Sequence, residues 1–191
     1  MAAESQRLVV GLSGSSAPQL GEMFLRVCRD IEGLEAHLVM SNGARRSIKL
    51  EMGEDPSVIE ELATVAYDPA DMGAAISSGS FLTIGMVVIP CSMGALGGIA
   101  AGTSTDLLRR AADVTLKERR PLVLCIRETP LNKIHIRNMS LAADAGATIF
   151  PLIPTFYNHP PSADAMAHEF ANRVLAHLGL AQPDAYHWKS Q

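Results

Sequence analysis

Five apolar segments alternate along the chain with segments of helical periodicity, and this alternation constrains the fold more than any other feature. The first opens the stretch RLVVGLSGSSAP, and the others are EAHLVM, GMVVIPCS, PLVLCI and GATIFPLIP. Each is almost continuously apolar, as are strands that helices cover on both faces. Helical spacing of apolar residues marks QLGEMFLRVCRDI, TSTDLLRRAADVTLKE, NKIHIRNMSLAADAG and ADAMAHEFANRVLAHLGL. Strands that alternate with helices predict an α/β fold built on a doubly wound parallel sheet.

The length of 191 residues fits a single domain, expected to span residues 1–191 with a C-terminal tail at about 181–191. A hydrophobic content of 48% with 19% charged residues excludes a disordered chain. The apolar runs fall short of the ~20 residues that span a bilayer, and the N-terminus lacks a secretory signal, so we expect a cytoplasmic protein. The three cysteines form no CxxC pair, which is typical of reduced, buried thiols.

The loops that follow the strands are the expected functional site, because ligands of doubly wound sheets bind beyond the carboxyl ends of the strands. The first loop, GLSGSSAP, offers a glycine backbone and serine hydroxyls to a phosphate, and a plain strand-to-helix turn explains it equally well. The third strand continues into PCSMGALGGIAAG. Its small residues favour a flat ring lying against the backbone, with tight helix packing as the alternative.

Cations are concentrated in one short stretch of a chain whose net charge is -4. They are Arg109, Arg110, Lys117, Arg119, Arg120 and Arg127. Because the pI is about 5.8, the stretch indicates a local anion site rather than a broad basic face for nucleic acid. Arg119 and Arg120 fit a solvated helix end. Arg127 and Glu128 directly follow a buried strand, so we expect them to face the crevice.

Other residue types exclude several chemistries. The six histidines form neither HExxH nor a paired spacing with cysteine, so no metal site is predicted. No GxSxG elbow is present, and Cys91 lacks a basic partner nearby in the sequence, which argues against acyl transfer. Tyr157 lies in the loop PTFYNHPP and is able to donate to an anion. Trp188 in the tail is expected to dock against a neighbouring subunit.

Eight motifs occur in a fixed order from about Val9 to Trp188. They are GLSGSSAPQLG, SNGARRSIKLE, SSGS, PCSMGALGGIAAG, LLRRAADVTLKERRPLVLCIRETPL, IHIRNM, PLIPTFYNHPPS and NRVLAHLGL. Together they resemble the UbiX/Pad-type flavin prenyltransferases, formerly described as aromatic acid decarboxylase small subunits. The resemblance implies a Rossmann-like, flavodoxin-type three-layer sandwich that forms trimers and, from these, dodecamers. It implies transfer of a dimethylallyl group from dimethylallyl phosphate to N5 and C6 of reduced FMN, giving prenylated FMN for a UbiD-type decarboxylase.

The resemblance also implies roles for individual residues. The FMN contacts are Ser13, Gly14, Ser16, Ser41, Ser92, Gly94 and Arg127, with Ser16 near flavin N5. The prenyl phosphate is held by Lys117, Glu128, Tyr157 and Arg173. Glu51 faces the reacting flavin edge from across a subunit boundary, and the catalytic set is Ser16, Glu51, Lys117 and Glu128.

This chemistry accounts for the charges around PLVLC. Breaking an allylic C–O bond leaves a carbocation and a phosphate, so groups that hold the developing phosphate charge lower the barrier. Lys117, Arg127 and Arg173 suit that role, and Glu128 suits a proton donor or relay. The prenyl donor is either the monophosphate or the diphosphate.

Three positions depart from the family pattern. Ala17 stands where a glycine is usual, Met72 where an aromatic often stands, and Arg137 where an acidic residue is frequent. The first two bear on pocket shape and donor choice, and the third bears on subunit contacts. Two alternative functions are an FMN carrier without prenyl transfer and an FMN-dependent cysteine decarboxylase; the early histidine and PxSANT-like motif of the latter are not visible in this sequence.

Overall fold

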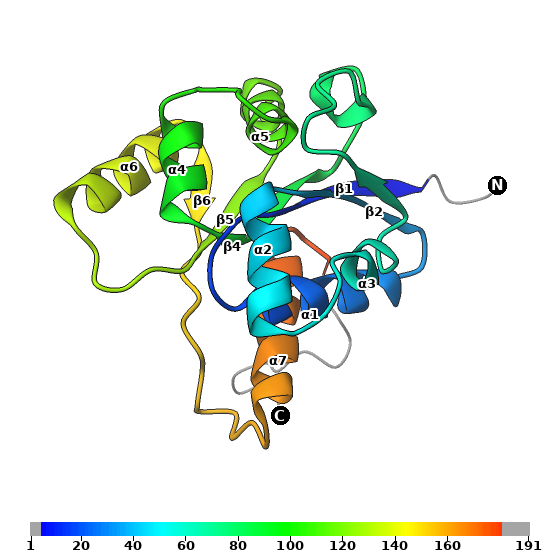
Figure 1. The fold of residues 1–191 in the computed structure, drawn as a ribbon, viewed down its shortest axis with the longest axis vertical. Coiled ribbons are helices and arrows are strands. Elements are labelled where there is room, and N and C mark those ends of the chain that lie inside the picture. The colour runs from blue at the N-terminus through cyan, green and yellow to red at the C-terminus, as the bar shows by residue number, and fades with distance from the viewer. Residues whose placement is uncertain (1–4, 181–191) are drawn as a thin grey trace.

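A computed structural model describes residues 5–180 and contains one sheet of parallel strands covered by helices on both faces (Figure 1). The strands are β1 (Gln6–Leu12), β2 (Leu34–Met40), β3 (Val65–Tyr67), β4 (Gly85–Cys91), β5 (Leu122–Ile126) and β6 (Ala147–Ile149). Their order across the sheet is β3-β2-β1-β4-β5-β6. This is the Rossmann order, and it confirms the predicted doubly wound α/β sandwich.

The described helices cover both faces of the sheet: those that follow β1 and β2 pack on one face together with the last helix, and those that follow β4 and β5 pack on the other. They are α1 (Pro18–Arg29), α2 (Asn42–Glu51), α3 (Ser57–Glu60), η1 (Ala75–Ser77), α4 (Met93–Ala100), α5 (Leu107–Lys117), α6 (Lys133–Asp144) and α7 (Ala163–His177). None of the described helices is long and apolar enough to cross a membrane. The predicted tail at 181–191, with Trp188, lies outside the described residues.

Alternating side chains of the strands form two separate cores, as the strand period of two requires. Leu8, Val10 and Leu12 of β1 pack with α1, α2 and α7 on one face of the sheet. Val9 of the same strand packs with α4, α5 and α6 on the other face. Figure 1 shows these two helix layers, with α4, α5 and α6 on one side and α1, α3 and α7 on the other. The near-continuous apolar strands of the sequence are thus explained by burial on both faces.

The order of the strands places a switch point between β1 and β4, which pair directly in parallel. Chain connections leave this point in opposite directions, so the loops after β1 and β4 diverge and open a crevice. Gly21 of α1 permits close packing there, because a Cβ on it would lie 2.7 Å from the Ile89 carbonyl oxygen of β4.

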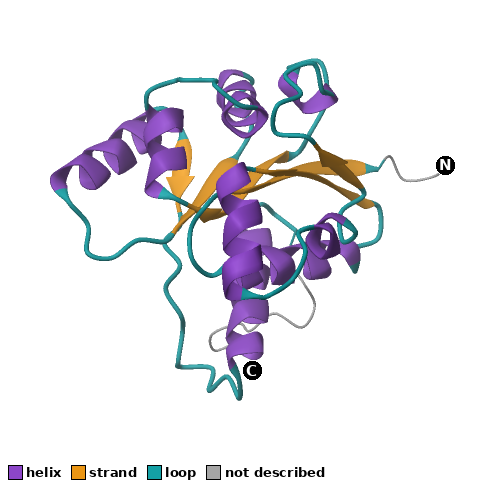
Figure 2. Ribbon diagram, viewed as in Figure 1, coloured by secondary structure: helices purple, strands orange, loops and turns teal. Residues whose placement is uncertain are grey.

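The sequence predicted five strands, and the structure has six. β3 was missed because VAY is short and its three residues are partly or fully exposed at the sheet edge. The fifth predicted strand ends early, at Ile149, although the Phe150 and Leu152 amides still donate to carbonyls of β5. A long loop then leaves the sheet before α7 (Figure 2).

Candidate active site

Ser13 joins the loops that follow β1 and β4. Its hydroxyl donates to the Pro90 carbonyl oxygen at 3.0 Å and accepts from the Ser92 amide at 2.7 Å. The side chain is buried, with 3% of its surface exposed. Ser13 therefore fixes the two loops relative to each other, and its hydroxyl has both of these partners before any ligand binds.

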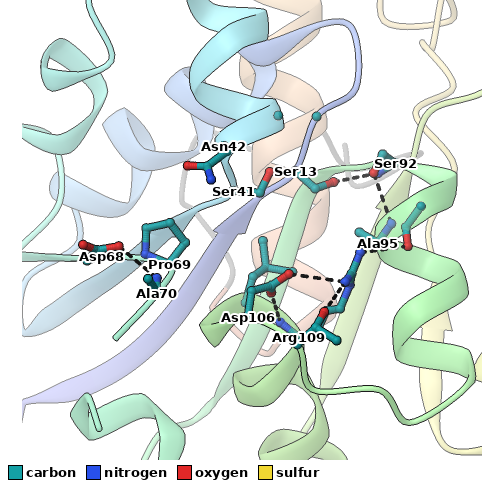
Figure 3. Close-up of a pocket in the computed structure, with 15 residues that line it drawn as sticks. Ser13, Ser41, Asn42, Asp68, Pro69, Ala70, Ser92, Ala95, Asp106 and Arg109 are labelled. Atoms are coloured by element: carbon teal, nitrogen blue, oxygen red, sulfur yellow. Dashed lines mark hydrogen bonds and ion pairs between the residues drawn. The ribbon is translucent and has the colours of Figure 1, made fainter. Parts of the chain in front are cut away.

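A cavity of about 520 Å³ opens beside Ser13, at the carboxyl ends of β1, β2 and β4 (Figure 3). It is lined by Ser13, Gly14, Ser41, Asn42, Gly43, Asp68, Pro69, Ala70, Ser92, Gly94, Ala95, Thr105, Asp106, Leu108 and Arg109. Four of the residues expected to contact FMN are thereby brought together from three separate loops: Ser13, Gly14, Ser41 and Ser92; Gly94 joins them at the start of α4. The size lies within the range typical of small-molecule sites.

Three helices begin at this cavity. Ser41 caps α2 by accepting from the Ala44 amide at 3.1 Å, and Ser92 caps α4 by accepting from the Ala95 amide at 3.2 Å. Asp106 caps α5. Each capping serine still has its hydroxyl hydrogen to donate. Helix N-termini also carry partial positive charge, so the cavity favours an anionic group.

Two glycines keep the cavity floor free of side chains. A Cβ on Gly14 would lie 2.8 Å from the Cα of Gly43, and a Cβ on Gly43 would lie 3.0 Å from the Cα of Gly14. The loop after β1 and the first turn of α2 therefore touch backbone to backbone, and larger residues would force them apart. Hydroxyl donors, helix N-termini and bare backbone together fit the phosphate end of FMN.

A second cluster lies around the last residue of α2, at the end of that helix away from the cavity, and the loop after β1 joins the two. Glu51 Oε2 accepts from the Ser16 hydroxyl at 2.9 Å and from the Ala17 amide at 3.0 Å. Ala17 has φ 69°, a left-handed conformation that turns the chain into α1. Ser16 and Glu51 are thus in contact, as their assigned roles require. This contact is made within one chain, and the expectation that Glu51 faces the flavin edge across a subunit boundary stays a prediction.

The loop after β5 joins the loop after β1. The Ser15 hydroxyl donates to the Arg127 carbonyl oxygen at 3.0 Å, and the Arg127 amide donates to the Cys91 carbonyl oxygen at 3.2 Å. Glu128 follows directly and is exposed. The expected placement of Arg127 and Glu128 at the crevice agrees with these contacts.

Arg173 and Tyr157 both follow β6, in α7 and in the loop that precedes it. Arg173 of α7 lines a cavity of about 330 Å³ beneath residues 149–155. That segment is tied to β5 by the Leu152 amide, which donates to the Ile126 carbonyl oxygen at 3.0 Å. Tyr157 follows in the same loop and is 47% exposed. Arg173 is thus placed in the helix layer that α7 forms with α1, and Tyr157 lies in the loop that precedes α7.

Lys117 lies near the amino ends of the strands, at the opposite end of the sheet from the cavity. α5 begins at the cavity and runs for 11 residues, about 16 Å, toward the amino ends of the strands. At its far end the Lys117 Nζ lies 2.7 Å from the position that a Cβ on Gly79 would take, and it pairs with Glu118. The expected clamp of Lys117 with Glu128, Tyr157 and Arg173 is therefore not formed within one chain.

Two of the glycines after β4 allow neighbouring helices to pack closely. Gly97 and Gly98 lie inside α4, where their missing side chains make room for Asn138 of α6 and Arg109 of α5. This is the tight helix packing that was the alternative for the segment, and the expectation that its small residues accommodate a flat ring stays a prediction. Arg109 itself was noted only as one of a group of cations, and its position in the cavity followed from no motif.

Several groups are excluded from the chemistry by their surroundings. Burial raises the pKa of the Cys91 thiol to about 12, so it is not a nucleophile at neutral pH. Among residues 5–180, no group of three or more His, Cys, Asp or Glu side chains is placed to hold a metal. Of the other departures, Met72 is 42% exposed in the loop after β3, and Arg137 is exposed on α6.

Comparison with known proteins agrees with this geometry. A family model described as Flavoprotein matches residues 2–169. The flavin prenyltransferase UbiX of Escherichia coli (strain K12) is 48% identical over 179 residues, which cover 94% of this chain and 95% of that protein. A dodecameric FMN-dependent UbiX-like decarboxylase from Escherichia coli O157:H7 superposes with TM-score 0.93 at 45% identity, covering 97% of this chain and all of the other. AnUbiX in complex with FMN and dimethylallyl pyrophosphate superposes with TM-score 0.94 at 42% identity, covering 98% and 100%.

Proposed function

Because the chain belongs to the Flavoprotein family and, within it, to the UbiX flavin prenyltransferases, we propose that it joins a dimethylallyl group to N5 and C6 of reduced FMN. The product is prenylated FMN, made for a UbiD-type decarboxylase. The observation that carries the proposal is the cavity of helix N-termini and serine hydroxyls beside the Ser16 and Glu51 pair. The cavity suits a phosphate, and the Ser16 and Glu51 pair suits proton transfer.

We place the phosphate end of FMN in the cavity and the ring end over Ser16. The hydroxyls of Ser41 and Ser92 donate to the phosphate, and the bare backbone at Gly14 lets the ligand pass close to the loop. The ring edge then meets the Ser16 hydroxyl, and the Arg127 main chain supports this loop through Ser15. Reduced flavin supplies the nucleophilic nitrogen and carbon for the reaction.

The residues of the crevice act on the prenyl donor and on protons. When the allylic C–O bond breaks, its electron pair stays on the phosphate oxygen, and cations that hold this oxygen stabilise the transition state more than the intact donor. Arg173 is assigned to that task, with Tyr157 as a neutral donor and Glu128 as the proton source for the leaving phosphate. Glu51 accepts a proton through the Ser16 hydroxyl, with which it shares a hydrogen bond of 2.9 Å.

Lys117 completes the clamp only if another copy supplies it. Its position at the far end of α5 supports this arrangement. The dodecameric UbiX-like relative supports a homo-oligomer, which we propose to be a dodecamer built of trimers. We also propose a cytoplasmic location, because all three cysteines, each within the described residues, are free and buried, as in reducing compartments.

The decisive experiment is an anaerobic incubation of the purified protein with reduced FMN and dimethylallyl phosphate, followed by mass spectrometry of the released flavin. A flavin heavier by one five-carbon unit is the expected result. The diphosphate is tested in parallel, since AnUbiX was crystallised with dimethylallyl pyrophosphate. Unmodified flavin with both donors, with FMN still tightly bound, would leave the FMN carrier as the better account.

A further inference from the structure

The FMN cavity has a charge imbalance that the capping serines do not resolve. Two carboxylates line it, those of Asp68 and Asp106, and Arg109 is its one cationic side chain among the described residues. The phosphate of FMN carries close to two negative charges at neutral pH. Without Arg109, only the partial positive charges of the helix N-termini would attract the phosphate, while two carboxylates repel it. The position of this single cation therefore decides how well the phosphate is held.

Arg109 is held at the rim of the cavity with unused donors. Its guanidinium donates to Thr105 Oγ1, lies 3.4 Å from Asp106 Oδ2 and reaches the Gly94 carbonyl oxygen only at 3.5 Å. The last two distances are long for hydrogen bonds, so both contacts are weak. A guanidinium has five N–H donors, and these contacts occupy at most three of them. Figure 3 shows Arg109 lying between Asp106 and Ala95, on the cavity side of both helices.

Gly98 makes this position possible. A Cβ on Gly98 would lie 2.5 Å from Arg109 Nε and 2.8 Å from its Cδ, so any side chain there would displace the guanidinium. Glycine inside a helix is less favourable than alanine, and α4 carries it at this position nonetheless. This loss of helix stability is offset if the guanidinium that occupies the space beside Gly98 binds a ligand.

We propose that Arg109 is the cation that binds the phosphate group of FMN, and that Gly98 keeps its place open. This inference rests on the proposed function, and it assigns a binding residue that neither a motif nor the resemblance identified. Arg109 approaches from the first turn of α5, while the serine hydroxyls approach from α2 and α4. The phosphate is then held between one full positive charge and two capping hydroxyls.

The test compares two ligands that differ only in the phosphate. Dissociation constants for FMN and for riboflavin are measured by flavin fluorescence on the full chain and on Arg109→Ala and Arg109→Lys. We expect Arg109→Ala to weaken FMN binding by about 10- to 100-fold, the usual range for a lost hydrogen-bonded charge, with riboflavin binding unchanged. Arg109→Lys keeps the charge but loses the planar fork, so a smaller loss of FMN affinity is expected.

A second pair of variants tests the role of Gly98 without removing the cation. Gly98→Ala is expected to lower the preference for FMN over riboflavin, because the new Cβ displaces Arg109. Gly97→Ala is the matched control, since its Cβ meets only the end of the Asn138 side chain, at 3.2 Å. Arg29→Ala removes an equal charge from the exposed end of α1 and is expected to leave both dissociation constants unchanged.

The outcomes are separable from those of the function assay. An unchanged FMN to riboflavin ratio in folded Arg109→Ala and Gly98→Ala would overturn the inference and leave Arg109 as a contact between α4 and α5. An unmodified protein that binds riboflavin as tightly as FMN would also overturn it. A protein that prefers FMN through Arg109 but transfers no prenyl group would contradict the proposed function and leave this inference standing.

Discussion

The Glu51 carboxylate combines a structural contact with a proposed chemical one. It accepts from the Ser16 hydroxyl and the Ala17 amide at the start of α1, a helix that lacks a side-chain cap of its own. Negative charge at a helix N-terminus is favourable. We expect Glu51→Ala to lose roughly 1 kcal/mol of unfolding free energy, measured by urea denaturation, because both donors lose their acceptor.

Glu51→Gln separates the two roles. The amide oxygen still accepts hydrogen bonds, so stability and FMN affinity stay close to those of the unmodified protein, while prenyl transfer slows because the amide cannot take up a proton. Turnover is followed by mass spectrometry of the flavin. Glu54→Gln, an exposed neighbour, serves as the control. Full turnover in Glu51→Gln would remove Glu51 from the proton path.

Ala17 holds a backbone conformation that suits glycine better. Its φ of 69° lies in the left-handed region, where a Cβ costs about 1 to 2 kcal/mol. We expect Ala17→Gly to raise the free energy of unfolding by up to about 1 kcal/mol, after the greater chain entropy of glycine is subtracted. Ala143→Gly, on an exposed face of α6, should instead lower it. A lower urea midpoint for Ala17→Gly would show that the turn is unstrained.

At the scale of elements, strand β2 carries a buried ionisable side chain in its middle. His37 is 4% exposed; its Nδ1 lies 2.9 Å from the Tyr67 hydroxyl and its Nε2 lies 3.6 Å from Glu35. Arg7 pairs with the same Glu35, and the Phe81 ring packs on His37 from the loop before β4. Burial lowers the pKa of His37, despite the nearby carboxylate.

This pKa shift predicts a pH dependence of stability. Because the pKa of folded His37 lies below its ordinary value of about 6.5, the unfolded chain binds more protons, and stability falls as pH drops below about 6.5. The contribution is complete above that pH. We expect urea midpoints between pH 7.5 and 5.5 to fall less in His37→Gln than in the unmodified protein. His159→Asn, an exposed position with φ 50°, should keep the original pH profile.

The elements that the sequence predicted are those whose periodicity reports burial. The strands β1, β2, β4 and β5 are mostly apolar because both faces are covered, and α1, α5, α6 and α7 show helical spacing. α2 was missed because Ala44 and Ile48 are its only buried residues. A helix at α4 was only the alternative to a ring-binding segment, because glycines at 94, 97 and 98 obscure a helix and its packing partners come from α5 and α6. Tertiary contacts, absent from any local pattern, decided those segments.

At the scale of the whole molecule, the topology explains which parts of the site could be predicted. Residues at the carboxyl ends of strands, such as Ser13, Ser92 and Arg127, were expected at the crevice and lie there, because parallel strands end at one edge. The position of Arg109 could not be predicted from the strand ends, because Arg109 follows no strand directly and lies in the first turn of α5. The role of Lys117 stays a prediction, and the structure places it at the end of α5 that lies away from the cavity.

The position of Lys117 leads to a test of the assembly. Lys117→Ala and Arg173→Ala are each expected to slow prenyl transfer at least about 10-fold while FMN binding stays unchanged, since neither residue lines the FMN cavity. If Lys117 of one copy acts in the site of another, co-expression of the two variants restores some sites. Random mixing gives each site an intact Lys117 and an intact Arg173 in about a quarter of cases.

The turnover of the hybrid assembly shows whether Lys117 and Arg173 act in one site from the same chain or from two chains. Activity near a quarter of that of the unmodified protein is expected, measured on hybrids purified through different tags on the two variants. If both residues acted within one chain, every site of the hybrid would lack one of them, and the hybrid would be as slow as its parents. Arg127 and Glu128 give the matching control, because these neighbours follow the same strand of one chain, so every site of a hybrid of Arg127→Ala with Glu128→Ala lacks one of them. Recovery with Lys117→Ala and none with Arg127→Ala would show that the phosphate clamp closes only where two copies meet.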